Sequence, residues 1–167
     1  MGTLEQVLVT PIRPYELLLG KVLPAVIIGL FDVLLALVVG SWVFGVPIRG
    51  SLPLLYLGCL VYLMSTVGLG LFVSTVSRTQ QQAIMGGFFL MMPAILLSGV
   101  MTPIENMPEW LQPLTWFNPV RYAVELLRGI LLKGAGFADL WRSFLALFGF
   151  GTVILAFASL RFRKRLG

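Results

Sequence analysis

The chain has 167 residues, of which 58% are hydrophobic and only 11% are charged, and its net charge is +5. A soluble domain usually carries about 25% charged residues, so much of this surface must face lipid rather than water. There is no histidine and a single cysteine, Cys59. The commonest general base and metal ligand is therefore missing, and an intrachain disulfide is excluded. We interpret Cys59, which lies in an apolar run, as a small buried or lipid-facing filler.

Residues 1–21 begin with a short amphipathic helix. The opening lacks the basic start and apolar core of a signal peptide and resembles sequence from the middle of a protein. Thr3 and Gln6 have capping-box spacing, and Pro11 and Pro14 end this helix and start the next. Taken alone, the helix could be an interfacial anchor. Its apolar face consists of Leu4, Val7 and Leu8.

Four apolar runs follow, each close to the length of about 20 residues that a helix needs to cross the hydrocarbon core. Charges separate the runs, and Asp32 is the only charged residue inside any of them. We predict an all-α polytopic membrane protein with four transmembrane helices. The predicted spans are 22–46, 52–77, 83–101 and 143–160.

The basic residues predict the orientation of these spans. Segments 1–21, 78–82 and 161–167 fall on one side and carry seven of the twelve basic residues. The positive-inside rule then places both termini in the cytoplasm and the 102–142 loop outside. The tail 161–167 is typical of a stop-transfer anchor to anionic lipid, so the positive charge indicates topology rather than nucleic-acid binding. The four tryptophans fall near the outer interface, as their amphipathic rings prefer; they are Trp42, Trp110, Trp116 and Trp141.

The 102–142 loop contains a second amphipathic helix. Asn118 followed by Pro119 is typical of a helix start, and Gly134 is placed to end the helix. We predict either a re-entrant hairpin or a helix packed on the membrane surface. Its predicted apolar face is Val120, Ala123, Val124, Leu127 and Leu131, and its charged face, spaced for ion pairs, is Arg121, Glu125 and Arg128.

Two features inside the spans have two readings each. Asp32 lies near mid-membrane, where a carboxylate is costly and must face protein or water. It either lines a substrate or proton path, or is a structural acid bonded to a neighbouring helix. Small residues recur at every fourth position of the second span, which allows close helix packing within the chain or against a second subunit. They are Thr66, Gly70 and Ser74.

No motif of a catalytic or metal site is present. The sequence lacks a phosphate-binding loop of the Gly-x-x-x-x-Gly-Lys-Ser/Thr type, a His-Glu-x-x-His motif and a Gly-x-Ser-x-Gly motif. An intramembrane aspartyl protease would need a second acid beside Asp32. We therefore expect no catalytic residue, no cofactor and no metal site.

Several stretches together resemble the ABC-2-type permeases, the membrane subunits of ATP-driven exporters. The resemblance covers essentially the whole chain. Such permeases usually have six spans, and this chain corresponds to the part from the cytoplasmic end of the second span to the C-terminus. The residues that carry the resemblance are 2–13, Glu16 to Lys21, Ser98-Gly99, Pro103 to Gln112, Asn118-Pro119, Arg121-Tyr122 and Arg128-Gly129.

The resemblance implies a function for the first helix. In the family, the cytoplasmic stretch between the second and third spans touches a separate ATPase subunit, and it corresponds here to residues 3–13. The chain would then be an exporter permease of the inner membrane that pairs with an ABC ATPase and with a second permease copy or paralogue. The implied ATPase-coupling residues are Thr3, Leu4, Glu5, Val7, Leu8 and Arg13.

Two other functions remain open. A non-transporting membrane scaffold or assembly subunit would have the same composition. An ion-coupled secondary transporter would use Asp32 as its titrating group. Lipid-like, drug-like, polymeric and ionic substrates are all compatible with an apolar helical bundle.

Overall fold

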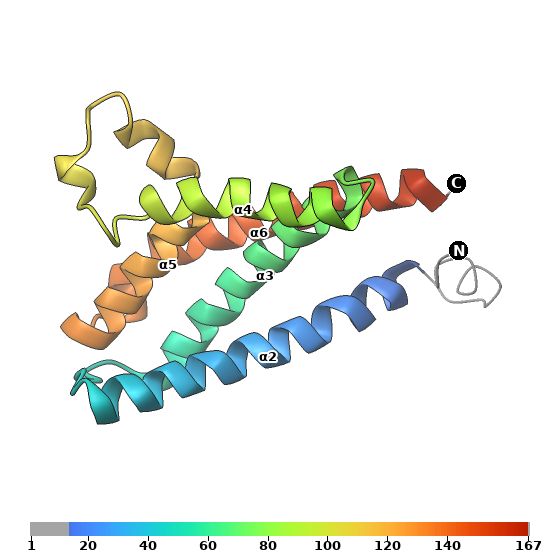
Figure 1. Cartoon of the computed structure of the whole chain (residues 1–167). Coiled ribbons are helices and arrows are strands. Elements are labelled where there is room, and N and C mark those ends of the chain that lie inside the picture. The colour runs from blue at the N-terminus through green and yellow to red at the C-terminus, as the bar shows by residue number, and fades with distance from the viewer. Residues whose placement is uncertain (1–13, 167) are drawn as a thin grey trace.

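A computed structural model describes residues 14–166, and every regular element within them is helical (Figure 1). The all-α prediction is confirmed for this part of the chain. In chain order the elements are α2 (Pro14–Val43), α3 (Leu52–Val76), α4 (Gln80–Leu96), η1 (Ile104–Asn106), η2 (Gln112–Phe117), α5 (Pro119–Arg128), η3 (Gly129–Lys133) and α6 (Phe137–Leu166).

Three helices are long and apolar enough to cross a membrane, over Val22–Val43, Leu52–Val76 and Phe137–Ala158. They coincide with three of the predicted spans. Helix α6 begins at Phe137, ahead of the predicted span 143–160, and the Gly136 N–H donates to Asp139 Oδ2 in its first turn at 3.2 Å. The residues Trp141 and Arg142, predicted to lie in the external loop, therefore belong to α6.

The remaining predicted span, 83–101, which is the third in chain order, is only partly helical. It coincides with α4, which has 17 residues and a length of about 26 Å, somewhat less than the hydrocarbon core of about 30 Å. Pro93 removes one backbone N–H from its last turns. Gly99 then turns the chain with a φ of +80°, a conformation that favours glycine. The helix consequently ends at Leu96.

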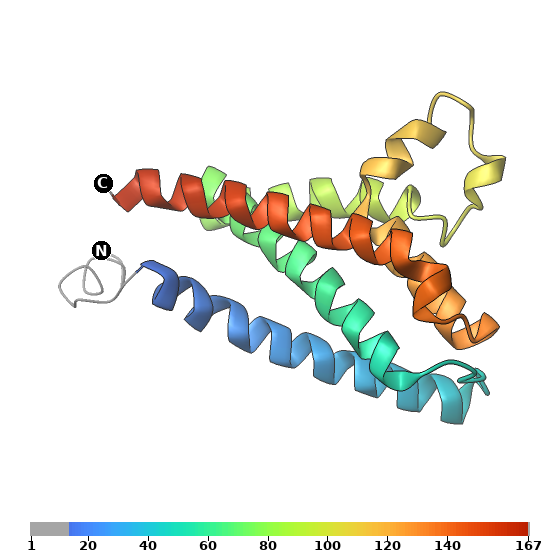
Figure 2. The same cartoon turned by 180° about the vertical axis from the view of Figure 1, so that it is seen from behind.

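Helix α3 crosses the molecule diagonally and contacts all the other long helices (Figures 1 and 2). It meets α2 near the 44–51 connection and α4 near the 77–79 turn, and α6 packs along it. The start of α2, the 77–79 turn and the end of α6 lie at one end of the bundle, called here the terminal end. The 44–51 connection and the 97–136 segment lie at the opposite end, called here the loop end.

The buried core lies where α3, α5, η3 and α6 meet. Leu55, Ile130 and Leu147 are almost completely inaccessible. Because lipid tails are as apolar as leucine, this packing is favoured by van der Waals contact more than by removal of surface from water. The core residues are Leu55, Cys59, Leu126, Ile130, Leu140, Phe144 and Leu147. Cys59 was predicted to be a small filler that is either buried or lipid-facing, and the structure shows that it is buried.

Small residues let α3 and α6 approach closely. The Ser65 hydroxyl is fully buried and donates to the Leu147 carbonyl at 3.0 Å. A Cβ atom added to Gly151 would lie 3.1 Å from Ser65 Oγ, and one added to Gly68 would lie 3.1 Å from the Ile154 side chain. This contact joins the two central helices without a large side chain between them.

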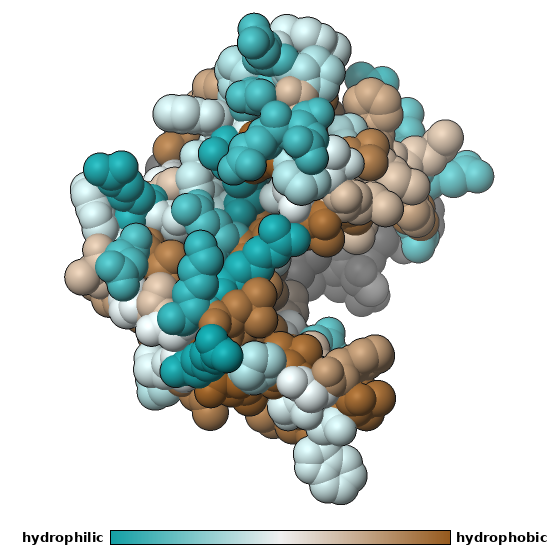
Figure 3. All heavy atoms as spheres, turned by 90° about the vertical axis from the view of Figure 1, so that its left-hand side faces the viewer, coloured by the Kyte–Doolittle hydropathy of each residue, from teal (hydrophilic) through white to brown (hydrophobic). Residues whose placement is uncertain are grey.

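Helices α2 and α4 expose most of their apolar side chains. The spanning part of α2 contributes no buried residue, and neither does α4. Phe89 of α4 is 80% exposed, for example. Figure 3 views the loop end, where polar and charged residues gather over much of the surface above an apolar lobe formed by the α2 side. The exposed faces of α2 and α4 suit contact with lipid or with further protein.

Candidate functional site

The 97–136 segment returns toward the helical bundle instead of lying across its end. Helix α5 runs beside α3 and α6 and buries Ala123 and Leu126 against them, and η3 buries Ile130 (Figure 1). At the loop end, the Arg49 N–H donates to the Leu131 carbonyl at 3.1 Å and fastens η3 to the 44–51 connection. Residues 119–133 are therefore packed against the same helices that form the core, whereas the preceding part with η1 and η2 projects away from the bundle (Figure 1).

The predicted ends of this helical stretch are confirmed, and its predicted apolar face is partly wrong. Asn118 caps α5 with Pro119 in its first turn, and Gly134 ends η3 with a φ of +65°. Ala123 is buried as predicted, but Leu127 is 37% exposed and Leu126 is buried instead. Leu126 lies three residues after Ala123 within α5, and this spacing shares a helix face just as the predicted spacing of four to Leu127 does.

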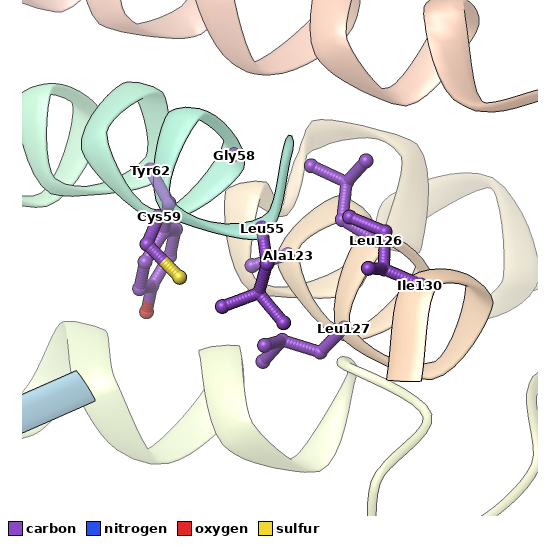
Figure 4. Close-up of a pocket in the computed structure, with 8 residues that line it drawn as sticks. All are labelled: Leu55, Gly58, Cys59, Tyr62, Ala123, Leu126, Leu127 and Ile130. Carbon is purple, nitrogen blue, oxygen red and sulfur yellow. The ribbon is translucent and has the colours of Figure 1, made fainter. Parts of the chain in front are cut away.

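A small apolar cavity lies between α3 and α5 (Figure 4). Its volume is about 20 Å³, which is room for a single water molecule at most. The lining side chains come from α3 on one side and from α5 and η3 on the other, and include Cys59 and Tyr62. This cavity is a packing void and is too small to be a substrate site.

Asn118 joins two helices with one side chain. Its Oδ1 accepts from the Val120 N–H at 3.1 Å, which caps the start of α5, and its Nδ2 donates to the Ala94 carbonyl at 2.6 Å. The Ala94 carbonyl needs this donor because the chain turns after α4 and the Ser98 N–H bonds to Ile95 instead. Asn118 is only 6% exposed. The amide therefore links the end of α4 to the beginning of α5.

Arg121 lies against two aromatic rings and a buried hydroxyl. Its guanidinium donates to Thr115 Oγ1 and stands 5.9 Å from the ring centre of Trp116 and 6.0 Å from that of Tyr122. The Tyr122 hydroxyl donates to the Trp116 carbonyl at 3.0 Å. These contacts hold η2 against the first turns of α5, with the cation stacked on aromatic faces.

The other charged residues of α5 have different surroundings. Glu125 accepts from the Ser143 hydroxyl of α6 at 3.0 Å. Arg121 and Glu125 thus bond to hydroxyl groups rather than to each other, so the spacing for ion pairs is not used in this part of the chain. Arg128 is exposed in the last turn of α5, where a cation is favoured by the helix dipole.

Asp32 lies on an exposed face of α2. Its neighbours one turn away, Ile28, Leu35 and Ala36, are also exposed. Among the described residues, no neighbouring helix covers this carboxylate. The reading of Asp32 as a buried acid bonded to another helix therefore has no support within residues 14–166.

The small residues of α3 form two series, and the predicted one is not used for packing in this part of the chain. Thr66 Oγ1 bonds to its own helix at Leu63 O, 3.1 Å away. A Cβ atom added to Gly70 would meet nothing within 4 Å, and Ser74 is exposed. The close contact with α6 is made by Ser65 and Gly68 instead. A contact of the Thr66 series with a second subunit remains a prediction.

The predicted ATPase-coupling residues lie outside the described part of the chain. This applies to Thr3, Leu4, Glu5, Val7, Leu8 and Arg13. The structure does place the start of α2, which follows them directly, at the terminal end of the bundle (Figure 1).

Comparison with known proteins finds transport permeases among the relatives of this chain. The chain is 46% identical over 142 residues to "Probable multidrug ABC transporter permease YbhR" of Escherichia coli, covering 85% of this chain and 39% of that protein. It is 38% identical over 168 residues to "Inner membrane transport permease YhhJ" of Escherichia coli, covering 99% of this chain and 45% of that protein. It is 26% identical over 169 residues to "ABC transporter G family member 20" of Dictyostelium discoideum, covering 98% of this chain and 23% of that protein. No solved structure gives a significant match.

The three long apolar helices, with α5 and η3 packed against two of them, define a helical membrane protein. A family model described as ABC-2 type transporter matches residues 1–132. The chain belongs to this family, and the resemblance seen in the sequence is confirmed. It spans less than half the length of the two Escherichia coli relatives described above.

The link made by Asn118 can be tested by substitution. Asn118→Ser keeps a good helix cap but is too short to reach the Ala94 carbonyl, whereas Asn118→Ala removes both bonds. We expect a loss of stability of about 1–3 kcal/mol for Ser, from the unpaired carbonyl, and about 1 kcal/mol more for Ala. Thermal unfolding of the purified chain in mild detergent measures both.

The matched control is Asn106→Ala, at an exposed asparagine in η1. Its stability should stay within about 0.5 kcal/mol of the parent chain. An Asn118→Ser variant as stable as this control would show that the bond to Ala94 contributes nothing.

Proposed function

We propose that this chain is the membrane-spanning part of an exporter permease that takes its energy from a separate ABC ATPase. The observation that carries the proposal is the family match over residues 1–132, together with 46% identity to a bacterial permease. The sequence has no phosphate-binding loop of its own. A permease of this kind must receive work mechanically, through a cytoplasmic element that a partner grips.

The proposed coupling element is the amphipathic helix within residues 3–13. It precedes α2, whose start lies at the terminal end of the bundle together with the 77–79 turn and the end of α6 (Figure 1). An ATPase bound there would reach every connection on that side. Closure of two ATPases would move two permease copies. The proposed contact between the copies is the series Thr66, Gly70 and Ser74 of α3, of which Gly70 and Ser74 are exposed and Thr66 is half-buried.

The proposed substrates are drug-like amphiphiles. The support is the similarity to YbhR, a probable multidrug ABC transporter permease. Exposed apolar faces on α2 and α4 are compatible with substrates that partition into lipid.

The coupling proposal predicts that Leu8→Glu weakens ATPase binding. A carboxylate placed in a buried contact costs several kcal/mol unless it can reach water. In a full-length permease carrying this substitution, we expect the ATPase to be lost on co-purification and substrate-stimulated ATP hydrolysis to fall at least ten-fold, while the spans remain inserted. The parent complex should contain two permease copies.

An interfacial anchor would respond differently, because the loss of some membrane affinity is small beside several spans. Unchanged ATPase binding and stimulation for both Leu4→Glu and Leu8→Glu would place the coupling surface elsewhere. Absence of any co-purifying ATPase with the parent permease would favour a scaffold instead.

The proposed topology has four spans, with α4 as the third, both termini in the cytoplasm and the loop end outside. The distribution of the twelve basic residues supports it, and so does the position of the start of α2 and the end of α6 at the same end of the bundle. Exposed tryptophans at 42, 110 and 116 suit the outer interface.

A cysteine at the exposed Lys133, next to Gly134, tests this topology without straining the left-handed turn at Gly134. The native Cys59 is buried and is replaced by alanine to give a clean background. In intact cells, an impermeant thiol reagent should label the residue-133 thiol as fully as it does after lysis. Labelling that needs lysis would invert the proposed orientation.

Asp32 is proposed to face a polar path rather than a neighbouring helix of this chain. Its support is the exposure of the carboxylate near the middle of the spanning part of α2, where contact with lipid alone would be costly. The acid would attract cationic groups of a substrate or, in the ion-coupled alternative, carry a proton.

Asp32→Asn keeps the size of the side chain and removes its charge. We expect export of cationic compounds to fall about ten-fold at unchanged expression, while the exposed neighbour variant Ala36→Asn retains most activity. Parent-level export by Asp32→Asn would make the acid structural. Export driven by an ion gradient in the absence of any ATPase would favour the secondary-transporter alternative.

A further inference from the structure

A second and larger cavity lies between α3 and α4 at the terminal end. It is an open groove with a volume of about 590 Å³, well within the range of sites that hold small organic molecules. Phe72, Val73 and Val76 of α3 form one wall, and Phe89 and Leu90 of α4 form the other. Gly86 of α4 lets the two walls approach each other, because a Cβ atom there would lie 3.2 Å from the Val73 side chain.

The groove is polar at one end only. Ser77, Arg78 and Gln82 line it beside the 77–79 turn. The Arg78 N–H donates to Gln82 Oε1 at 3.0 Å, which holds the glutamine beside the turn, while the exposed Arg78 side chain also lines the groove. Among the described residues, the Arg78 guanidinium has no carboxylate partner.

The position of this polar end matches the edge of a membrane. Val76 is the last residue of the spanning stretch Leu52–Val76, and Arg78 follows two positions later. Basic side chains just past a span lie at the level of lipid head groups. The apolar walls then run from that level into the hydrocarbon.

The depth of the groove distinguishes an acyl chain from a protein helix. Along α4 it extends from Gln82 to Leu90, which is about 12 Å at the helical rise. One leaflet contributes about 15 Å of hydrocarbon, whereas a spanning helix would need about 30 Å of contact. A groove that is one leaflet deep, with a cation at its wet end, has the polarity of an anionic lipid.

We propose that this groove binds an anionic phospholipid of the cytoplasmic leaflet, with its phosphate at Arg78 and an acyl chain between Val76 and Phe89. The choice of leaflet rests on the topology proposed above. Such a lipid would fill the space between the terminal ends of α3 and α4, so the relative position of these helices would depend on lipid composition.

The test uses the purified, delipidated chain in mild detergent, titrated with palmitoyl-oleoyl-phosphatidylglycerol or with the corresponding phosphatidylcholine. Native mass spectrometry counts the bound lipids. We expect one phosphatidylglycerol to bind more tightly than phosphatidylcholine. Arg78→Gln should weaken phosphatidylglycerol binding about five-fold, in line with the contribution of one arginine near an anionic lipid.

The matched control is Arg49→Gln, at an exposed arginine in the short connection of the loop end. It should leave phosphatidylglycerol binding unchanged. Val76 lines the groove and its side chain is 49% exposed, so Val76→Trp places a large ring in the groove. This substitution should remove the bound lipid while Arg78 remains unchanged. Circular dichroism and gel-filtration elution confirm that each variant is folded.

Equal binding of the two lipids, or equal effects of Arg78→Gln and Arg49→Gln, would overturn the proposal. The groove would then be a contact site for another protein segment. Preference for phosphatidylglycerol that survives Val76→Trp would place the lipid elsewhere and also overturn it. Co-purification of the ATPase is measured separately. Its loss would overturn the proposed function alone, and loss of lipid preference with the ATPase still bound would overturn the lipid site alone.

Discussion

A backbone carbonyl or amide that enters lipid must find its partner within the protein, because hydrocarbon offers none. In this chain, three long-range bonds to backbone carbonyls join separate elements. Asn118 donates to the Ala94 carbonyl, the Ser65 hydroxyl donates to the Leu147 carbonyl, and the Arg49 amide donates to the Leu131 carbonyl. They fasten the start of α5 to the end of α4, α6 to α3, and η3 to the 44–51 connection. Apolar packing alone would specify these positions poorly, since lipid competes for the same contacts.

Features set by the solvent or by local geometry could be predicted from the sequence. Charges are excluded from hydrocarbon, so their spacing predicted α2, α3 and α6 correctly, and the Asn118-Pro119 pair predicted the start of α5. Features that depend on the rotation of a helix about its axis could not be predicted from the sequence. The series that packs, Ser65 and Gly68, lies next to Thr66 and Gly70 on the same helix, and hydropathy does not distinguish the two. The bond from Asn118 to Ala94 had only the indirect signal of Pro93 near the end of α4.

Exposure has a different meaning for apolar and for charged side chains in this protein. An uncovered leucine or phenylalanine on α2 costs nothing in lipid, so the open faces of that helix do not by themselves indicate a partner. An uncovered carboxylate at the same depth is costly. Asp32 therefore indicates which face of α2 needs a polar neighbour. The longer length of the relatives leaves room for such a neighbour in the remainder of a full permease.

Helix α4 is held mainly at its two ends. At the terminal end, the Gln82 N–H bonds to Thr79 Oγ1 and the Arg78 N–H to Gln82 Oε1; at the loop end, Asn118 holds the Ala94 carbonyl. No residue between these points is buried. Lateral displacement of α4 would therefore disrupt few packed contacts, whereas displacement of α6 would break the core around Leu147. Asn118 also caps α5. A displacement of the end of α4 would therefore move the start of α5 through this side chain.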